Sequence, residues 1–444
     1  MADLSIDFAG ILSPNPFWLA SAPPTNTGDQ VMRAFDHGWG GAVWKTLGNP
    51  IIDTSSRFGS IDVGNQRMVG FNNIELITDR PLDVNLREIR ECKKRYPKHV
   101  VIVSLMVESK EDWRDIITRV VDTGADGLEL NFGCPHGMCE RGMGSAVGQE
   151  PEVLKTVAGW AVEYSSIPVL IKLTPNVGDI LEPGVAAAEA NVHGLSLINT
   201  IKSITGVDLD RMVPHPVVGR QSTNGGYCGP AVKPIALHMV AALARDPRIK
   251  IPISGIGGIA TWRDAAEFLA LGATSVQVCT SVMHYGFRVV EDLIDGLSNF
   301  LDEKGMKSVS ELTRRAVPAY TDWGDLDLNY KVAAHVDTTK CIGCDLCLVA
   351  CRDSSVNCIH TGEHPLPAGH RAPSRDAAIA RARETGVKVT WVDWDECTGC
   401  NLCSHVCPVH GCITMVEDRN GKPFESWNDR IAKGTNKVPG GLHD

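Results

Sequence analysis

Eight short apolar runs, separated by segments of helical length, are the feature that most limits what this chain can fold into. Runs of this kind alternating with helices are the pattern of a (β/α)8 barrel. The runs are Phe17–Ser21, Ala42–Lys45, Val100–Leu105, Gly127–Asn131, Val169–Leu173, Leu195–Asn199, Ile251–Ser254 and Ser275–Cys279. We therefore predict an α/β fold, with a TIM barrel at 1–310, a linker at 311–335 and a second domain at 336–444.

The charge of the chain and the length of its apolar stretches argue against two classes of partner. With 444 residues, a net charge of −10 and a pI near 5.8, the chain lacks the basic surface that nucleic acid or an anionic membrane would attract. No stretch reaches the roughly 18 apolar residues that a transmembrane helix needs, and no basic and apolar leader opens the sequence. We expect a soluble, cytoplasmic protein that binds neither nucleic acid nor membrane.

Polar residues and glycines gather where the predicted strands end. They are Ser21, Lys45, Asn131, Lys172, Asn199, Gly257 and Thr280. Each could be an ordinary loop residue, but barrel enzymes carry their chemistry at this end of the strands. The sequence therefore predicts an active site at the C-terminal mouth of the barrel. Two long connections, Thr46–Asn73 and Thr200–Pro230, leave the same end and are either binding loops or tolerated insertions.

Two runs of four cysteines define the second domain. Both have the spacing C-x2-C-x2-C-x3-C, and a proline follows the second run. This is the pattern of α+β, two-cluster bacterial ferredoxins, in which the last cysteine of each run binds the cluster of the other run. The pattern assigns Cys341, Cys344, Cys347 and Cys407 to one 4Fe-4S cluster, and Cys397, Cys400, Cys403 and Cys351 to a second. Two structural zinc sites are the alternative, since paired cysteines also bind zinc.

The rest of the second domain adds one predicted helix and two further thiols. The helix covers Arg375–Thr385, with Ser374 as its N-cap and Gly386 as its stop. Cys358 and Cys412 belong to neither run, and we expect them to be buried apolar thiols. Thiols at metal-ligand spacing favour a reducing compartment. Because iron–sulfur clusters carry single electrons, organic redox chemistry in the barrel needs a flavin to convert those electrons into hydride.

A glycine-rich segment with a cysteine follows the fourth predicted strand. It reads Asn131-Phe-Gly-Cys134-Pro-His136-Gly-Met-Cys-Glu-Arg-Gly-Met-Gly. A thiol on such a loop at the mouth of the barrel is placed to give a proton to a bound substrate, as a general acid does. For an isolated residue of this kind, a small buried cysteine is the alternative.

This loop resembles the active-site loop of dihydropyrimidine dehydrogenases, and the wider class 1 dihydroorotate dehydrogenase group shares the barrel and the Asn-x-x-Cys core. The resemblance covers nearly the whole chain. It includes Asn15–Pro24, Trp44–Thr46, Asn73–Ile77, Lys172–Asn176, Asn199–Thr200, Gly255–Gly258 and the C-terminal ferredoxin-like part. One departure is Gly133, where the family often has serine, so that one hydroxyl contact near the substrate or the flavin is absent.

The resemblance implies that FMN is the cofactor of the barrel. The residues that it assigns to FMN are Ala20, Ser21, Lys45, Thr46, Asn131, Lys172, Asn199, Gly226, Gly257, Gly258, Cys279, Thr280 and Ser281. A lysine near the N1–C2 edge of the ring would stabilise the anionic reduced flavin. The glycines, with the residues after the last strand, resemble the phosphate site that barrels build from their final two loops.

The resemblance also implies a pyrimidine substrate held over the flavin. The residues assigned to the substrate are Asn73, Glu75, Ile77, Asn131, Asn199 and Thr200. A primary amide matches an adjacent acceptor and donor on a uracil edge with two hydrogen bonds. Cys134 is the implied general acid, and His136 either tunes its thiol, assists loop closure or faces solvent.

These assignments predict an oxidoreductase that reduces uracil or thymine at the 5,6 double bond, with hydride from FMN to C6 and a proton from Cys134 to C5. No Gly-x-Gly-x-x-Gly follows an early strand, which argues against a doubly wound fold and against a dinucleotide site on this chain. Electrons are then expected to arrive through the clusters from a partner subunit that binds FAD and NAD(P) and carries iron–sulfur clusters, in a hetero-oligomer such as a heterotetramer. A cysteine-type dihydroorotate dehydrogenase and an electron carrier with a scaffold barrel are the alternatives.

Overall fold

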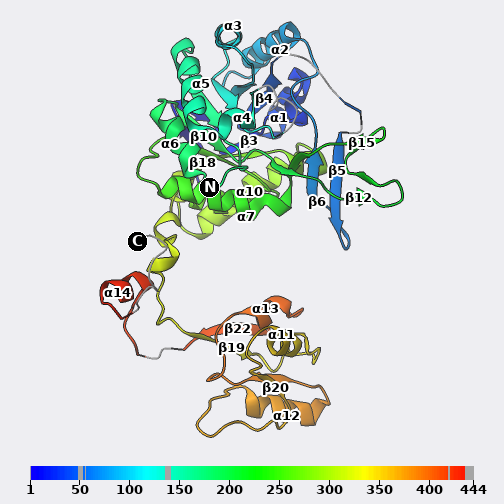
Figure 1. Cartoon of the computed structure of the whole chain (residues 1–444), viewed down its shortest axis with the longest axis vertical. Helices are drawn as coiled ribbons and strands as arrows, with labels where there is room; N and C mark the ends of the chain where they lie inside the picture. Colours follow the sequence, from blue (N-terminus) through cyan, green and yellow to red (C-terminus); the bar gives the residue numbers. More distant parts are fainter. Residues whose placement is uncertain (1, 49–53, 56, 136–141, 419–420, 436–444) are drawn as a thin grey trace, which may run out of the picture. The chain divides into compact units, whose positions relative to one another are not determined.

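The eight apolar runs form one closed barrel of parallel strands in the computed structural model, which describes residues 2–48, 54–55, 57–135, 142–418 and 421–435 (Figure 1). The strands are β3 (Phe17–Leu19), β4 (Gly41–Leu47), β7 (Val100–Leu105), β8 (Gly127–Asn131), β9 (Val169–Lys172), β10 (Gly194–Leu197), β17 (Ile253–Ile256) and β18 (Ala273–Val278). They follow one another around the ring in chain order, and β18 pairs with β3 to close it. The predicted barrel is confirmed.

The barrel strands are buried along almost their whole length, which explains why they are continuous apolar runs rather than alternating ones. The bounds of β7 and β8 are those predicted. The strand β10 ends at Leu197, two residues before the predicted end, and β17 begins and ends two residues later than predicted. Asn199 therefore lies beyond its strand, on the segment that leaves the barrel.

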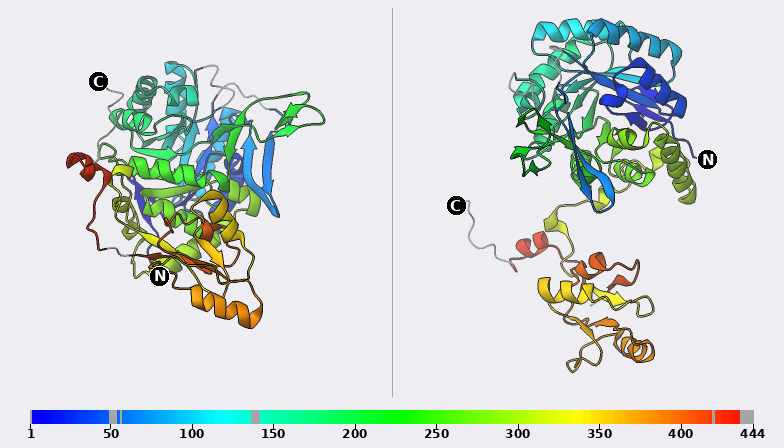
Figure 2. Two further views of the ribbon diagram at one scale, coloured as in Figure 1. Left: turned by 60° about the horizontal axis from the view of Figure 1, so that its bottom comes forward. Right: turned by 90° about the vertical axis from the view of Figure 1, so that its right-hand side faces the viewer.

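The helices between the strands form an outer layer around the barrel (Figure 2). They are α1 (Gly28–His37), α2 (Leu82–Arg95), α3 (Lys110–Val121), α4 (Ser145–Gly148), α5 (Pro151–Tyr164), α6 (Leu181–Glu189), α7 (Lys233–Arg245), α8 (Trp262–Ala270), α9 (Thr280–Tyr285) and α10 (Val289–Glu303). In α1, α3 and α8 the residue before the helix, Thr27, Ser109 or Thr261, accepts a hydrogen bond from the third backbone amide and so caps the first turn. No helix in the described part of the chain is long and apolar enough to cross a membrane.

An N-terminal hairpin covers the end of the barrel at which the strands begin. It consists of β1 (Ile6–Phe8) and β2 (Ile11–Ser13). A Cβ at Gly194, the first residue of β10, would lie 2.7 Å from the Phe8 ring, and a Cβ at Gly127, the first residue of β8, would lie 3.1 Å from Ile11. With this end filled by apolar side chains, the opposite end is left for a site.

Both long connections contribute strands to one antiparallel sheet outside the barrel. Its order is β11 (Ile201–Ser203), β16 (Gly225–Cys228), β6 (Gln66–Asn73) and β5 (Phe58–Val63). The short pairs β12 (Val207–Asp208) with β13 (Val213–Pro214), and β14 (Val217–Val218) with β15 (Gln221–Ser222), lie between β11 and β16 in the sequence. In this sheet Gly226 pairs with Asn73, so residues from the two connections meet at the mouth of the barrel.

The chain divides into two compact units, Met1–Tyr320 and Thr321–Asp444. In the second unit β19 (Val332–Val336) pairs with β22 (Ile413–Glu417), and β20 (Ile359–Thr361) pairs with β21 (Thr390–Val392). Its helices are α11 (Leu346–Ser354), α12 (Arg375–Thr385), α13 (Leu402–Val406) and α14 (Trp427–Ala432). Six of the eight cysteines of the two runs belong to its core or pack against it, and the core also contains the fully buried Trp391, whereas Cys344 and Cys400 are exposed.

The helix α12 has the predicted bounds, and Gly386 ends it in the left-handed conformation, at φ 73°. The predicted capping role of Ser374 is wrong. Ser374 precedes the helix, but its φ and ψ of −92° and −2° are helical rather than extended, and its side chain makes no cap hydrogen bond. Its buried hydroxyl has no hydrogen-bond partner among the described residues.

The segment expected to link the two domains has structure of its own. Its first part, with η4 (Val309–Glu311) and η5 (Val317–Ala319), packs on the barrel through buried Leu312 and Val317. Its second part, with η6 (Trp323–Asp325), belongs to the second unit and pairs with the C-terminal segment, where the backbone amide of Leu328 donates to the carbonyl of Glu425 at 2.9 Å. The expected linker at 311–335 is therefore divided between the two units.

Candidate active site

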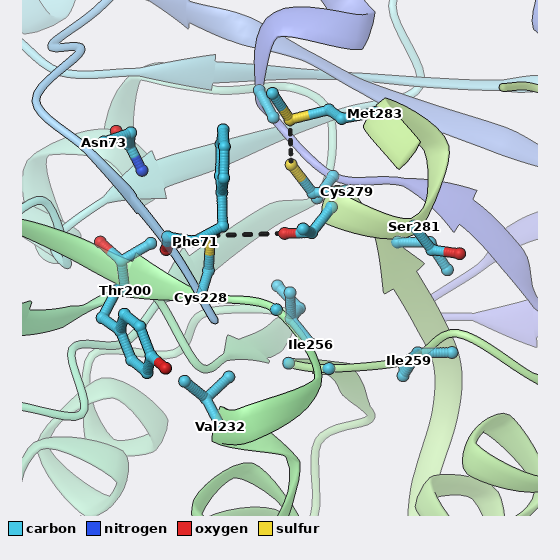
Figure 3. Close-up of a pocket in the computed structure, with 18 of the residues that line it drawn as sticks. Phe71, Asn73, Thr200, Cys228, Val232, Ile256, Ile259, Cys279, Ser281 and Met283 are labelled. Carbon is cyan, nitrogen blue, oxygen red and sulfur yellow. Dashed lines mark hydrogen bonds between the residues drawn. The ribbon is translucent and has the colours of Figure 1, made fainter. Parts of the chain in front are cut away.

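A cavity of about 620 Å³ opens at the C-terminal ends of the barrel strands, and Figure 3 shows part of it. Most of the predicted site residues line it. They are Ala20, Ser21, Lys45, Thr46, Asn73, Glu75, Asn131, Cys134, Lys172, Asn199, Thr200, Gly257, Gly258, Cys279, Thr280 and Ser281. Strand ends that are far apart in the sequence therefore converge on one volume, which is of the size that small ligands and cofactors occupy.

Three predicted residues are not among those that line the cavity. Ile77 lies behind it, in an apolar cluster with Cys134. Gly226 lies under Thr200, because a Cβ at Gly226 would be 2.0 Å from the Thr200 hydroxyl oxygen. His136 is outside the described residues. Ile77 and Gly226 therefore lie behind residues that line the cavity, Cys134 and Thr200 respectively.

Lys45, at the end of β4, is buried and paired with a carboxylate. Its Nζ lies 2.6 Å from Oε2 of Glu75, and the other oxygen, Oε1, accepts from Arg57 at 3.0 Å. The Lys45 side chain is 8% exposed and that of Glu75 12% exposed, so the pair is largely out of water. This arrangement fixes one ammonium group at the wall of the cavity.

Lys172, at the end of β9, is also buried next to a carboxylate. Its Nζ lies 3.7 Å from Oε1 of Glu129, a residue that is fully buried inside the barrel. The other oxygen of Glu129 accepts hydrogen bonds from the hydroxyl of Ser196 at 2.7 Å and from the amide of Gln277 at 3.1 Å. Each cavity lysine thus has its own carboxylate.

Glu129 was not predicted from the sequence, because it lies inside an apolar run and not at the end of its strand. A signal was present, since residues two apart on a strand face the same side, and Glu129 is two residues before Asn131. A charged residue within a continuous buried strand is also rare enough to single out.

Three polar side chains of the cavity form a chain of hydrogen bonds. The Asn131 amide nitrogen donates to the Thr46 hydroxyl at 3.1 Å, and its oxygen accepts from the Asn199 amide at 2.9 Å. The Asn199 oxygen in turn accepts from the backbone amide of Thr200 at 2.8 Å. These bonds fix the orientation of both primary amides. Each oxygen accepts a second hydrogen bond, that of Asn131 from the backbone amide of Gly133 at 3.3 Å and that of Asn199 from the Thr200 hydroxyl at 3.5 Å, so each amide has one N–H left to donate to a ligand.

Gly133 leaves room for the Asn199 side chain. A Cβ at Gly133 would lie 2.3 Å from the Asn199 Cβ and 2.5 Å from its amide nitrogen, distances at which something must shift. The consequence of having glycine here is therefore larger than the loss of a hydroxyl, because any side chain at this position would displace Asn199.

Cys134 is 5% exposed and packs against apolar side chains at the edge of the cavity. Its neighbours in this cluster are Ile77, Met106 and Met143. Its backbone carbonyl accepts from Ser145 at 3.0 Å, so the first turn of α4 holds the start of the loop. The carbonyl of the following Pro135 accepts from the Asn224 amide at 3.3 Å, which ties the loop to the segment before β16.

The far end of the cavity is built from the last two strand ends and from β16. Gly257 and Gly258 have φ values of 134° and 73°, which favour glycine, and they follow β17. Thr280 donates to the sulfur of Cys228 at 3.3 Å, and the sulfur of Cys279 lies 3.8 Å from that of Met283 (Figure 3). Burial raises the pKa of Cys228 to about 11 and the pKa of Cys279 to about 12, so both thiols are protonated at neutral pH.

The outer wall of the cavity comes from the long connections and was not predicted. It contains Asn65, Gln66, Arg67, Met68 and Val69 from the turn and start of β6, with Phe71 and Tyr227. The sequence could not assign these residues, since antiparallel pairing between distant segments brings them to the barrel.

Two small cavities in the second unit each gather five cysteines. The first is lined by Cys341, Cys344, Cys347, Cys407 and Cys412, and the second by Cys351, Cys358, Cys397, Cys400 and Cys403. Each cavity brings together one complete predicted ligand set, including the cysteine that crosses over from the other run. The prediction that Cys358 and Cys412 are buried is confirmed, since each is 3% exposed.

The spacing of these thiols fits a cluster better than a single ion. In the part of the chain that the structure describes, no three His, Cys, Asp or Glu side chains converge closely enough to hold one metal ion. Thiols arranged around a cavity are what a four-iron cluster requires, whereas a structural zinc site needs four ligands at one point.

The donor set of the barrel cavity fits a flavin. Two buried ammonium groups and two primary amides line it, and these are partners for the carbonyl oxygens and ring nitrogens of an isoalloxazine ring. The glycine-rich end after β17 and β18 is where barrels bind phosphate.

The comparisons with known proteins agree with this architecture. The family model for dihydroorotate dehydrogenase matches residues 4–301, and the model for a 4Fe-4S dicluster domain matches residues 334–415. The NAD-dependent dihydropyrimidine dehydrogenase subunit PreA of Escherichia coli (strain K12) is 40% identical over 428 residues, which cover 94% of this chain and 96% of that protein.

Two further relatives cover less of the chain. The chloroplastic dihydropyrimidine dehydrogenase (NADP(+)) of Arabidopsis thaliana is 40% identical over 344 residues, 74% of this chain and 81% of that protein. The catalytic subunit of dihydroorotate dehydrogenase B (NAD(+)) of Pyrococcus abyssi is 37% identical over 317 residues, 70% of this chain and 97% of that protein. The chain combines the barrel of this family with a 4Fe-4S dicluster domain, and it matches a dihydropyrimidine dehydrogenase subunit over nearly its full length. The resemblance seen in the sequence is therefore confirmed, and the chain belongs to the dihydroorotate dehydrogenase family.

Proposed function

We propose that this chain is the pyrimidine-reducing subunit of a dihydropyrimidine dehydrogenase, an oxidoreductase that converts uracil and thymine to their 5,6-dihydro products. The observation that carries the proposal is the convergence of Cys134, the two paired lysines and the linked amides of Asn131 and Asn199 on one cavity. The relatives named dihydropyrimidine dehydrogenase support the same reaction.

Cys134 is proposed as the general acid that gives its proton to C5 of the pyrimidine. Its thiol lies at the cavity and is packed against Met106 and Met143, so that bulk water is kept from this side. A positioned acid spares the site a free enolate, because the proton arrives where negative charge develops. His136, which follows it on the loop, is proposed to assist the thiol.

The amides are proposed to hold the substrate. Asn131 and Asn199 keep fixed orientations through their hydrogen bonds to Thr46 and Thr200, and Asn73 lies across the same cavity. Each has one N–H left to donate to a carbonyl oxygen of the pyrimidine. Glu75 and Ile77 are proposed to shape the floor of this site.

FMN is proposed as the cofactor of the cavity, and when bound it supplies hydride to C6. Lys45 and Lys172 would place positive charge at the ring, and their carboxylate partners hold them in place. The other proposed contacts are Ala20, Ser21, Thr46, Asn131 and Asn199 along the ring and ribityl chain, and Gly257, Gly258, Cys279, Thr280 and Ser281 around the phosphate. Gly226 is proposed to act behind them, because it lies under Thr200.

Two 4Fe-4S clusters are proposed for the second unit, one on Cys341, Cys344, Cys347 and Cys407 and one on Cys397, Cys400, Cys403 and Cys351. Their electrons are proposed to come from a partner subunit that binds FAD and NAD(P), in a hetero-oligomer such as a heterotetramer. The relative PreA is itself named as a subunit, which supports a partner. A reducing compartment, the cytoplasm, suits thiolate ligands.

Oxidation of dihydroorotate is the second candidate, because the barrel also matches dihydroorotate dehydrogenase B catalytic subunits. The dicluster domain favours the first candidate. The match to the dihydroorotate dehydrogenase B subunit covers 97% of that relative but only 70% of this chain, so part of this chain has no counterpart there. Turnover of uracil, thymine, orotate and dihydroorotate by purified protein, with artificial electron donors and acceptors, separates the two. We expect reduction of uracil or thymine, and turnover restricted to the orotate pair would contradict the proposal.

The partner is tested with NADH. The isolated chain should reduce uracil with a strong artificial donor but not with NADH, and adding the FAD-containing subunit should restore NADH-dependent turnover. Fast NADH-driven reduction of uracil by the isolated chain would refute the need for a partner.

A further inference from the structure

The hydroxyl of Thr390 lies in the first of the two cysteine cavities. Thr390 begins β21, and its side chain is 1% exposed. Its Oγ1 is 3.6 Å from the sulfur of Cys347 and 4.0 Å from the sulfur of Cys341, both within hydrogen-bond reach for sulfur. A strand from the segment between the two cysteine runs therefore places a hydroxyl against two proposed ligands of the same cluster.

The other side chains around this cavity offer no donor as strong as a hydroxyl. Ile342, Val409 and Ile413 are apolar, and the carboxylate of Asp345 accepts from Lys388 at 2.9 Å. The thiol of Cys412 lies 3.8 Å from the carbonyl of Asp337 and also contacts Cys407, but an S–H group is a weaker donor than a hydroxyl. Among the described residues that line the cavity, Thr390 is the one with a hydroxyl.

The direction of the hydrogen bond follows from the state of the ligands. A cysteine that binds iron does so as a thiolate and has no proton to give, so the Thr390 hydroxyl must be the donor. A hydrogen bond to a ligand sulfur stabilises negative charge on the cluster, and the reduced cluster carries one more electron than the oxidised one. Donation therefore raises the reduction potential.

The second cavity provides a comparison within the same chain. There the Ser355 hydroxyl lies 3.5 Å from the sulfur of Cys400. Both residues are exposed, so water competes for the same sulfur and the hydroxyl changes little. The two sites thus have the same type of contact, buried in one and solvated in the other.

We propose that Thr390 sets the reduction potential of the cluster on Cys341, Cys344, Cys347 and Cys407 by donating a buried hydrogen bond to the Cys347 thiolate. Thr390 is a positioning and tuning residue, because it touches a ligand rather than the substrate. The inference rests on the ligand sets proposed above, and iron analysis tests those sets separately from the potential.

The test compares Thr390→Val with Ser355→Ala in the full chain. Valine keeps the branched shape of threonine in the strand and removes only the hydroxyl. Redox titration followed by electron paramagnetic resonance gives the midpoint of each cluster, and iron and sulfide are measured on the same samples. At the wild-type midpoint of this cluster, Thr390→Val should lower the ratio of reduced to oxidised cluster about tenfold, which corresponds to about 59 mV for one electron.

Two further variants keep the outcome clear. Thr390→Ser retains the hydroxyl and should keep the midpoint near that of the wild type, and Thr390→Ala removes the hydroxyl without placing a methyl group against the cluster. Ser355→Ala should change the ratio at the other cluster less than about twofold, because water replaces the lost donor. Unchanged midpoints in Thr390→Val and Thr390→Ala with full iron content would overturn the proposal, as would equal shifts in the threonine and serine variants.

Discussion

The ammonium of Lys172 lies 3.7 Å from the carboxylate of Glu129, and both side chains are buried at the inner end of the cavity. Glu129 is also held by Ser196 and Gln277, so the carboxylate is fixed from two other strands of the barrel. The position of Lys172 is therefore decided inside the barrel, one layer below the residues that line the proposed flavin site.

Glu129→Gln should destabilise the protein, because it leaves the Lys172 ammonium buried without its carboxylate. Removing one partner of a buried pair typically costs roughly 3–5 kcal/mol. Thermal or denaturant unfolding measures the loss. The double variant Glu129→Gln with Lys172→Met should lose less than the sum of the two single variants, and strict additivity would show that the two side chains do not interact.

Cys134→Ala should retain flavin and iron but lose nearly all reduction of uracil, because the thiol is proposed to supply a proton and not to hold a cofactor. Loss of a general acid typically lowers the rate roughly a hundredfold to ten-thousandfold. Absorbance spectra of the purified variant verify that the cofactors are present. A rate near that of the wild type at neutral pH would eliminate Cys134 as the acid.

Gly133→Ala should weaken pyrimidine binding, because the added Cβ would lie 2.3 Å from the Cβ of Asn199 and must displace that side chain. We expect KM for uracil to rise about tenfold, the cost of one misplaced hydrogen-bonding amide. Gly159→Ala on α5 is the matched control, since a Cβ there has nothing within 4 Å. Equal kinetics for the two variants would mean that Asn199 does not contact the substrate.

The anaerobically purified chain should contain about eight iron and eight labile sulfide, from two clusters of four. Cys400→Ala should reduce both counts to about half, because Cys400 belongs to one proposed ligand set only. In the complex with the proposed FAD-containing subunit it should also abolish NADH-driven turnover, while leaving some donor-driven chemistry in the barrel. Zinc in place of iron would refute the proposed clusters.

Cys228 and Cys279 should resist alkylation at neutral pH. Burial raises the pKa of Cys228 to about 11 and the pKa of Cys279 to about 12, so the reactive thiolate forms only in strongly alkaline solution. Mass spectrometry after iodoacetamide treatment at increasing pH measures the labelling of each residue. Rapid labelling of either residue at pH 7 in the folded protein would contradict the effect of burial.

Much of this protein could be predicted from its sequence, because the signals are local. A strand buried on both faces must be a continuous apolar run, and for that reason β7 and β8 have the predicted bounds. The spacing of the cysteine runs likewise predicts which thiols share a cluster, and both predicted sets lie in separate cavities. The strand-end residues Lys45, Asn131 and Lys172 reach one cavity because parallel strands in a barrel end at the same face.

Tertiary structure alone decided the contacts between distant segments. The pairing of Glu75 with Lys45 and of Glu129 with Lys172, the hydroxyl of Thr390 beside Cys347 and the outer wall from β6 all join segments that are far apart in the sequence. The role of Gly133 also depends on the side chain of Asn199, which lies on the segment after another strand, β10. The periodicity of apolar residues and the spacing of motifs in the sequence indicate how a segment is buried. The partner of a buried polar group is decided only when the barrel closes and brings distant side chains within hydrogen-bond distance.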